Sequence, residues 1–195
     1  YEIGAVELLT ESQQLRAQLA QQGLNKLFFD IEQPLCVVLR NMEERGVRVS
    51  TDVLKALEKK YGEIIEGLTK EIYSLAGETF NIASPKQLGD ILFDKLGLPH
   101  GKKTKTGYSV SEDVLSNLAP KHPIVNAVLE YRHYSKLQST YVMGLQPLVN
   151  RGRIHTEFNQ CITQTGRLSS TNPNLQNIPA RSDEAKDIKS AFIPG

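Results

Sequence analysis

The chain has 195 residues, 39% hydrophobic and 23% charged, which is typical of a soluble globular protein with one large or two small domains. It contains no run of about 18 apolar residues, which excludes a membrane-spanning helix, and no P-loop, G-x-S-x-G or H-E-x-x-H motif. The net charge of +1 divides into −4 over residues 1–97 (11 Lys/Arg, 15 Asp/Glu) and +5 over residues 98–195 (12 against 7), a pattern that points to a polyanionic partner.

The first half of the chain is predicted to be helical. A polar-rich helix over 7–22 ends at Gly23, and a second helix over 28–44 ends at Gly46, because glycine commonly terminates helices. A short extended segment, 47–49, follows the second helix. The apolar stripe of this helix consists of Phe28, Ile31, Leu35, Val38, Leu39 and Met42.

Two long helices are predicted next, one beginning after Ser50 or Thr51 and ending at Gly77, the other beginning after Pro123. The spacing of three and four residues between their apolar positions favours packing against each other at a shallow angle. These positions are Leu54, Leu57, Tyr61, Ile64, Leu68, Ile72 and Leu75 in the first helix, and Ile124, Val128, Tyr131, Leu137, Tyr141 and Leu145 in the second.

Shorter helices are predicted between the long ones. Ser84 and Pro85 mark a helix start, with Gln87 completing a capping box, and this helix ends at Gly97. Ser111 is predicted to begin another helix, which ends at Leu118.

The period of the pattern changes from helical to two at Arg153, which predicts one strand over 153–162. An irregular segment over 163–181, here called the donor loop, follows, and a helix over 183–191 is capped by Ser182 or Asp183. The predicted fold class is α+β: mostly α-helical, with two long antiparallel helices and the beginning of an antiparallel sheet.

Two groups of cations are candidates for phosphate contacts. Lys102, Lys103 and Lys105 lie between Gly101 and Gly107 with no acid among them, which suits duplex phosphates or a solvated loop equally well. Arg132 and Lys136 are four positions apart, so they share one helix face. Such a pair can hold an anion, although ordinary surface charge explains it better.

The donor loop is rich in hydrogen-bonding side chains. Pro173 and Pro179 restrict its backbone, and Gly166 permits close approach of a partner. Arginine and side-chain amides are the donors that read the DNA minor groove, where every correct base pair offers nearly the same acceptors. Such donors could test pair shape and ignore sequence, whereas a loop that bonds to its own main chain is the open alternative. The donors are Arg167, Asn174, Gln176 and Asn177.

The stretch TGRLSSTNPNLQNIP resembles a signature of family A DNA polymerases, and the similarity extends over nearly the whole chain. FFDIEQPLCVVLRNMEERGVRV, FNIASPKQLGDILFDKLGLP, HPIVNAVLEYRHYSKLQSTY and GRIHTEFNQ resemble successive segments of the family's thumb and palm. The resemblance implies the end of an exonuclease-like domain over 1–25, a helical thumb over 26–150 and the start of a palm over 151–195.

The resemblance also implies roles for single residues. Arg167 would contact the minor groove at the primer-terminal pair, and Asn174, Gln176 and Asn177 would contact the strands upstream, supported by Ser169. The other implied contacts are with DNA phosphates: Arg132 and Lys136 near the active site, Arg181 at the primer backbone, and Lys102, Lys103 and Lys105 at the thumb tip. Ala83 stands where the family commonly has Asn or Ser, which puts a polar DNA contact there in doubt.

The family implies template-directed DNA synthesis in replication and repair, with primer–template DNA and dNTP as partners and Mg²⁺ as cofactor. Its metal-binding carboxylates and its dNTP-binding helix come from segments absent from this sequence, so we expect the chain not to polymerise alone. Asp183, Glu184 and Asp187 favour helix capping over metal binding. A monomer in the bacterial cytoplasm, associated with the nucleoid, is expected, and Cys36 and Cys161 are not expected to pair.

A non-enzymatic helical adaptor or DNA-binding module is the alternative prediction, with the donor loop as a structural cap. Both ends of the sequence favour a piece of a longer protein.

Overall fold

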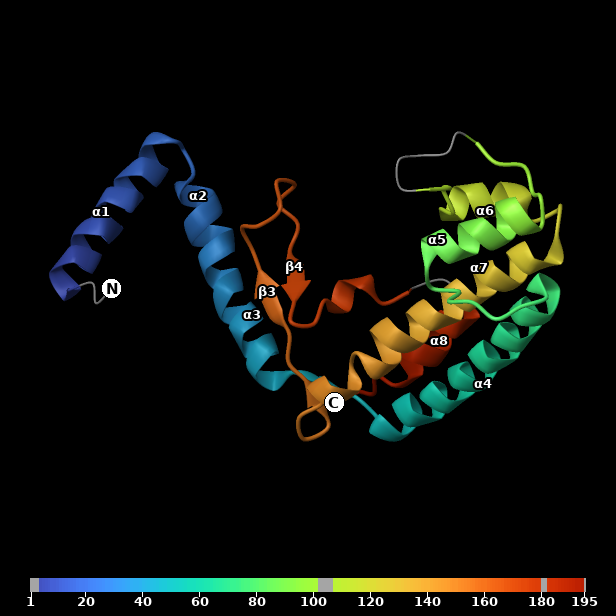
Figure 1. Ribbon diagram of the computed structural model, residues 1–195. Coiled ribbons are helices and arrows are strands. Elements are labelled where there is room, and N and C mark those ends of the chain that lie inside the picture. The colour runs from blue at the N-terminus through green and yellow to red at the C-terminus, as the bar shows by residue number, and fades with distance from the viewer. Residues whose placement is uncertain (1–3, 102–106, 180–181, 195) are drawn as a thin grey trace. The chain divides into compact units, whose positions relative to one another are not determined.

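The computed structural model describes residues 4–101, 107–179 and 182–194 (Figure 1). By its internal contacts the chain divides into two compact units, and each is described by itself. The first unit contains the residues up to Arg48 together with Arg153–Asn177, and the second contains Val49–Gly152 together with Ile178–Pro194.

The first unit combines helices with short antiparallel strands. Its helical elements are α1 (Ala5–Gln21), α2 (Asn25–Leu27), the π-helical turn η1 (Phe28–Glu32), α3 (Gln33–Arg45) and the 3₁₀ turn η5 (Leu175–Asn177). Its strands are β1 (Val47–Arg48), β2 (Arg153–Ile154), β3 (Glu157–Asn159) and β4 (Ser169–Thr171). Strand β1 pairs with β2, and β3 pairs with β4.

Both N-terminal helices were predicted, but the apolar stripe of the second helix is mostly not a core. Gly23 and Gly46 end α1 and α3 with positive φ angles of 69° and 62°. Leu39 is the buried residue of α3, whereas Ile31, Val38 and Met42 are exposed. The helical period therefore located the helix, but it did not identify what the helix packs against within the described residues.

The single strand predicted over 153–162 is wrong in its extent. Residues 153–154 pair with β1, residues 157–159 pair with β4, and a bend begins at Gln160. Ile162, which was expected on the apolar face, is 69% exposed. The alternating pattern persists through residue 162, but its two parts pair with different strands in separate sheets.

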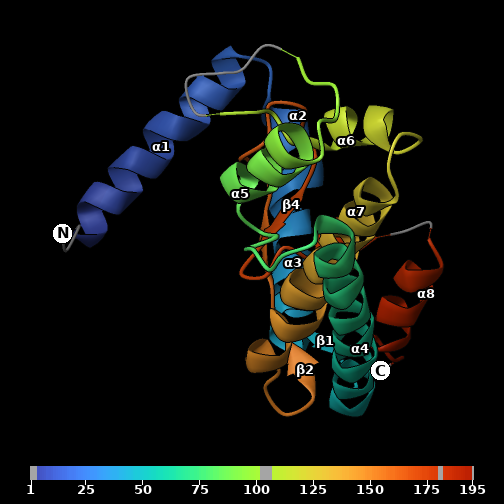
Figure 2. The same ribbon diagram turned by 45° about the vertical axis from the view of Figure 1, so that its right-hand side comes forward.

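The second unit is built on two helices that run in opposite directions, as predicted (Figures 1 and 2). Its elements are α4 (Thr51–Ala76), α5 (Pro85–Gly89), the π-helical η2 (Asp90–Lys95), α6 (Glu112–Leu118), α7 (Pro123–Lys136), the π-helical η3 (Leu137–Met143), the 3₁₀ turn η4 (Gln146–Leu148) and α8 (Asp183–Ser190). Helix α8 lies against α4.

The predicted helix starts are largely confirmed by their caps. The Ser50 hydroxyl accepts from Val53 N–H at the start of α4, and the Ser182 hydroxyl accepts from Ala185 N–H at the start of α8. The Ser84 hydroxyl accepts from Gln87 N–H, but the Gln87 side chain accepts from Asn81 N–H instead of closing the expected capping box.

Two buried clusters hold the second unit together. The larger joins the C-terminal half of α4 to α5, η2, α6 and α7, and the smaller joins the N-terminal half of α4 to η3 and α8 through Tyr61, Val142 and Ile188. The fully buried members of the larger cluster include Ile72, Leu88, Leu92, Leu115, Ile124 and Val128. These apolar contacts fix the helices that carry the candidate DNA contacts.

Candidate nucleic-acid interface

The donor loop was predicted to be irregular, but β4 and the turn η5 lie within it, and hydrogen bonds of hydroxyl groups hold the turn that follows β4. The buried Thr156 hydroxyl is 2.7 Å from the Ser170 hydroxyl and donates to the Pro173 carbonyl at 2.8 Å. The Ser170 hydroxyl also accepts from Leu175 N–H at 3.1 Å. Because these hydrogen bonds are buried or partly buried, they fix the main chain around the turn that follows β4.

The predicted donors Arg167, Asn174, Gln176 and Asn177 are all exposed. The Thr163 hydroxyl donates to the Arg167 carbonyl at 2.6 Å, which holds the main chain at that arginine. Two of the side-chain amides form hydrogen bonds within the loop. Gln176 Nε2 donates to the Leu168 carbonyl, and Asn174 Oδ1 accepts from Gln176 N–H. The loop thus supports its own shape and still presents these side chains to solvent.

Ser169 differs from the four exposed donors, because its hydroxyl group is buried. Its hydroxyl oxygen is buried and has no hydrogen-bond partner within the part of the chain that the structure describes. Ser169 lies on β4, where it pairs with Asn159 of β3. This buried position on β4 agrees with a supporting role, which stays a prediction.

Arg132 and Lys136 lie one helical turn apart on α7, as predicted, but their environments differ. Arg132 is half-buried and its Nη1 donates to the Val110 carbonyl at 2.6 Å, whereas Lys136 is exposed. Burial lowers the pKa of the Arg132 guanidinium, and nearby Glu112 raises it by a smaller amount. The Val110 contact gives Arg132 a structural role that the sequence did not indicate.

Arg132 lines a groove with a volume of about 590 Å³. It is lined by Ala83, Pro85, Tyr108, Val110, Ser111, Tyr131, Arg132 and Ser135. The predicted contacts Lys102, Lys103, Lys105 and Arg181 lie outside the described residues.

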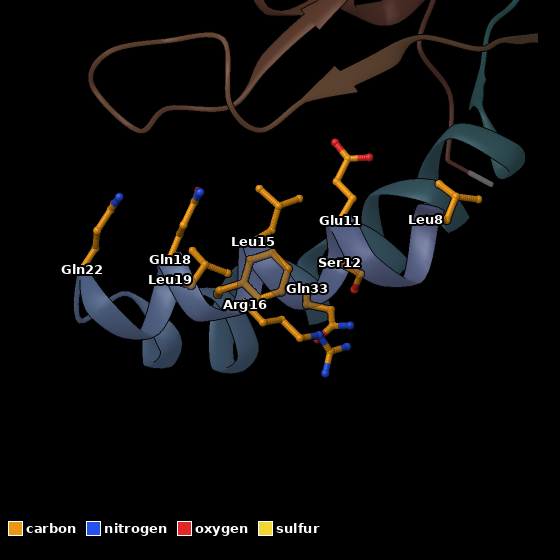
Figure 3. Close-up of a pocket in the computed structure, with 10 residues that line it drawn as sticks. Leu8, Glu11, Ser12, Leu15, Arg16, Gln18, Leu19, Gln22 and Gln33 are labelled. Carbon is orange, nitrogen blue, oxygen red and sulfur yellow. The ribbon is translucent and has the colours of Figure 1, made fainter. Parts of the chain in front are cut away.

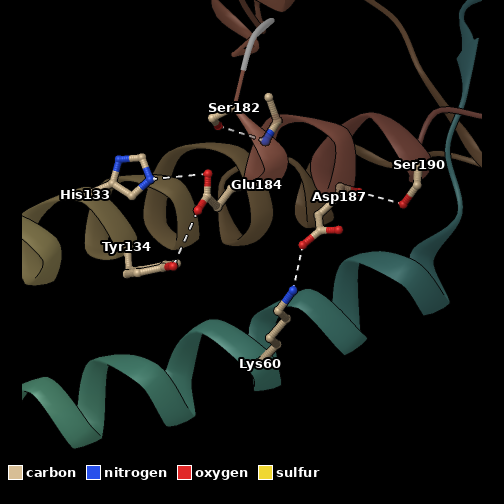
Figure 4. A network of polar contacts seen from close by, with 8 residues as sticks. Lys60, His133, Tyr134, Ser182, Glu184, Asp187 and Ser190 are labelled. Carbon is tan, nitrogen blue, oxygen red and sulfur yellow. Dashed lines mark hydrogen bonds and ion pairs between the residues drawn. The ribbon is translucent and has the colours of Figure 1, made fainter.

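The acidic side chains of α8 hold this helix against α4 and α7 (Figure 4). Asp187 pairs with Lys60 of α4 at 2.7 Å, and Glu184 is 3.5 Å from the Tyr134 hydroxyl of α7. The pKa of Glu184 is lowered, first by its own main-chain N–H and next by the Ser182 hydroxyl. The lowered pKa agrees with the predicted capping role, but the pairing across helices was missed because sequence spacing reveals only neighbours within one helix.

The described residues do not fit a divalent metal site. No three His, Cys, Asp or Glu side chains come together between residues 4 and 194 outside the two undescribed gaps. The acids of α8 are engaged with cations or hydroxyl groups, including Asp183 with Lys186. Over the same ranges, no helix is long and apolar enough to cross a membrane.

Tyr61 offers a test of the packing between α4 and α8. Its hydroxyl is buried with no hydrogen-bond partner among the described residues, and burial is the main cause that raises its pKa to about 12. We expect Tyr61→Phe to raise the free energy of unfolding by about 1 kcal/mol. The unfolded tyrosine ionises near pH 10, so wild type alone should lose stability from this position between pH 10 and 12.

Urea unfolding of both proteins at pH 7 and at pH 11 measures these effects. A loss of more than about 1 kcal/mol in the variant at pH 7 would mean that the hydroxyl is hydrogen-bonded in solution.

A second groove lies in the first unit, and no predicted site residue is among those that line it (Figure 3). It has a volume of about 660 Å³ between α1 and the start of the next helices, and Arg16 lies over the Phe29 ring at 5.6 Å. Leu8, Leu15, Leu19 and Phe28 supply its apolar part. Nothing in this unit indicates what would occupy the groove.

Comparison with known proteins gives one consistent family. A model described as DNA polymerase family A matches residues 51–195. DNA polymerase I of Streptococcus pneumoniae serotype 4 is 53% identical over 183 residues, which cover 92% of this chain and 21% of that protein. DNA polymerase I of Bacillus subtilis strain 168 is 52% identical over 188 residues, covering 93% and 21%.

A solved structure agrees with the sequence comparisons. It is described as the POL domain of Pol1 from M. smegmatis in complex with DNA primer-template and dNTP. Its TM-score is 0.87 at 41% identity, with 98% of this chain and 34% of that chain covered. The chain spans about a fifth of the length of the curated relatives it matches.

Proposed function

The chain belongs to DNA polymerase family A, and on that premise we propose that it forms the thumb and the start of the palm of a DNA-directed DNA polymerase. Residues 26–150 are the proposed thumb, residues 151–195 the start of the palm and residues 1–25 the end of an exonuclease-like domain. In this proposal the chain holds the primer–template duplex while nucleotides are added in replication and repair.

The exposed donors of the donor loop are the observation that carries the proposal. Arg167 and Gln176 stand on a loop whose shape is fixed by the buried hydroxyls of Thr156 and Ser170. A fixed array of donors suits the minor groove, because its acceptors are nearly the same for all correct base pairs. We assign Arg167 to the primer-terminal pair and Asn174, Gln176 and Asn177 to the pairs upstream, with Ser169 beneath them.

Phosphate contacts are assigned to the cations. Lys102, Lys103 and Lys105 would contact the product duplex at the thumb tip, Lys136 a phosphate near the active site, and Arg181 the primer backbone. Arg132 would contact a phosphate with the part of its guanidinium that does not bind the Val110 carbonyl.

The remaining chemistry is proposed for other segments of such a polymerase. We propose Mg²⁺ as the metal and dNTP as the second substrate, with ligands outside this chain, since the described residues do not fit a metal site. A monomer in the bacterial cytoplasm is the proposed state, and Cys36 and Cys161 are free thiols, in keeping with a reducing compartment.

Duplex binding by the chain tests the proposal. We expect a short DNA duplex to bind weakly, without sequence preference, and with an affinity that falls steeply as salt rises, because bound lysines and arginines release counterions. Four contacted phosphates would give a slope of log K against log salt of about −3.6. Fluorescence anisotropy titrations of several sequences at several salt concentrations measure both quantities.

Two outcomes would contradict the proposal. Affinity indifferent to salt would remove the electrostatic account of binding. No binding at low salt would favour the adaptor, in which the donor loop serves only as a structural cap.

A further inference from the structure

Two half-buried carboxylates lie on the face of α3 that carries the buried Leu39. Glu32 ends η1 directly before α3, and Glu43 lies near the end of α3. Glu32 is seven positions before Leu39 and Glu43 is four positions after it, so the helical period places all three on one face. Partly buried carboxylates need polar partners, which indicates that the element packed against this face supplies donors.

These donors come from β3 and the residues beside it, which lie along α3 (Figure 1). Glu43 Oε1 accepts from Phe158 N–H at 2.6 Å, and the Glu43 carbonyl accepts from His155 Nδ1 at 2.8 Å. Gln160 Nε2 donates to the Glu32 carboxylate at 2.8 Å and to the Glu32 carbonyl at 3.1 Å. Hydrogen bonds therefore join this segment to the helix before, within and after the strand.

The bond from Phe158 to Glu43 lies on the edge of β3 that β4 does not occupy. Phe158 is opposite Ser170 of β4, but its N–H donates to the carboxylate of α3. A charged acceptor makes this bond stronger than one between neutral groups. It also gives a partner to a main-chain donor that an edge strand would otherwise leave open.

The position of β3 determines the position of the donors, because β3 and β4 form one hairpin. Arg167 is two positions before Ser169, the first residue of β4. Gln176 of η5 donates to the carbonyl of Leu168, which directly precedes β4. A shift of β3 along α3 would therefore move β4 and, with it, both Arg167 and Gln176.

We propose that Glu43 and Gln160 are positioning residues, which hold the hairpin on α3 and so set where Arg167 meets a DNA base pair. Glu32 is the acceptor for Gln160 in this role. The proposal rests on the proposed function of Arg167 at the primer-terminal pair. A donor can test pair shape only if it stays where a correct pair places its acceptor, and residues behind the donor supply that precision.

Single-turnover extension of matched and mismatched primers, by a polymerase that contains this chain, tests the positioning role. We expect Glu43→Ala to lower the matched-to-mismatched ratio about threefold to tenfold, because β3 loses a bond to α3. Glu43→Gln keeps an oxygen that can accept from Phe158 N–H and should restore most of the ratio. Gln160→Ala should also lower the ratio, and Glu32→Ala should lower it less, because Gln160 also bonds to the Glu32 carbonyl.

Coupling to Arg167 separates positioning from a general loss of stability. If Glu43 acts through Arg167, Glu43→Ala should change the ratio much less in a protein that already carries Arg167→Ala than in wild type. Glu44→Ala is the matched control, because this neighbouring carboxylate of α3 pairs with Arg40 of the same helix, and it should leave the ratio unchanged. Circular dichroism checks that each variant is folded.

Each outcome supports or overturns the positioning role. An unchanged ratio in folded Glu43→Ala and Gln160→Ala, while Arg167→Ala lowers it, would overturn that role and leave the proposed function intact. Effects of Glu43→Ala and Arg167→Ala that multiply would also overturn it. If Glu43→Ala does not fold, Gln160→Ala serves in both measurements. An Arg167→Ala variant with the wild-type ratio would instead contradict the proposed function of Arg167 itself.

Discussion

Extension of a matched primer by a polymerase that contains this chain should slow about 10- to 100-fold when Arg167 is replaced with alanine. The Arg167 side chain is exposed, and its main chain is held by the Thr163 hydroxyl. In the proposed function, its guanidinium contacts the primer-terminal pair, where a misplaced acceptor would weaken the contact. The variant should therefore also lose part of its preference for matched over mismatched primers.

Duplex affinity should change much less, by under about threefold, because one cation among many is lost. Single-turnover extension from matched and mismatched primers, with affinity measured in parallel, gives all three quantities. Arg40→Ala is the matched control, since that exposed guanidinium pairs with Glu44 on α3 of the same unit. Identical matched-to-mismatched ratios in wild type and variant would exclude a role of Arg167 in sensing pair shape.

The helices could be predicted because their signals are local. Ser50, Ser84 and Ser182 stand where a helix begins, and Gly46 and Gly77 where one ends. Each signal works within about one turn of chain, through the hydroxyl that accepts from an N–H or through the positive φ of glycine. The apolar spacing of α4 also identified a core, because most of its predicted positions are buried.

The strands could not be placed because their partners are remote in sequence. The alternation over 153–162 predicts which side chains share one face of a strand, but it does not identify the partner strand. In the structure, its two parts pair with β1 and β4. The π-helical η3 was missed for a similar reason. Leu137 and Tyr141 of η3 are buried, as predicted. The π-helical hydrogen-bond pattern, however, cannot be recognised from the spacing of apolar residues.

Candidate site residues could be chosen from the sequence by side-chain type, but their hydrogen-bond and ion-pair partners could not be predicted. The exposure of Arg167 and Gln176 follows from a polar, irregular segment. The Val110 carbonyl that binds Arg132 lies 22 residues away, and the Lys60 that binds Asp187 lies 127 residues away. No periodic sequence pattern reveals such pairs. A cation that is assigned to a phosphate can therefore also bind a group within its own chain.

Alanine at Gly46 is expected to cause a large loss of stability, about 2–4 kcal/mol. Gly46 ends α3 with φ 62° and ψ 173°, a backbone conformation that is essentially restricted to glycine. A Cβ there would lie 2.8 Å from two atoms of the His155 ring and 2.9 Å from the Ile154 carbonyl. Backbone strain and steric overlap therefore act together.

The neighbours of Gly46 have little freedom to move. His155 Nδ1 donates to the Glu43 carbonyl at 2.8 Å, and Arg153 Nη1 donates to the Gly46 carbonyl at 3.1 Å. Relief of the overlap would break one of these bonds or shift Ile154 in its pairing with Val47. The variant should thus loosen the connection between the end of α3 and β2, which precedes the β3–β4 hairpin in the chain.

Gly23→Ala is the matched control for Gly46→Ala. Gly23 has a similar φ of 69° but no atom within 4 Å of a Cβ, so alanine there should cost only about 1 to 2 kcal/mol. Urea unfolding of both variants, followed by circular dichroism, compares them directly. Equal losses would show that φ alone matters at both sites, whereas a larger loss at Gly46 measures the close approach of β2, because this contact is what distinguishes the two glycines.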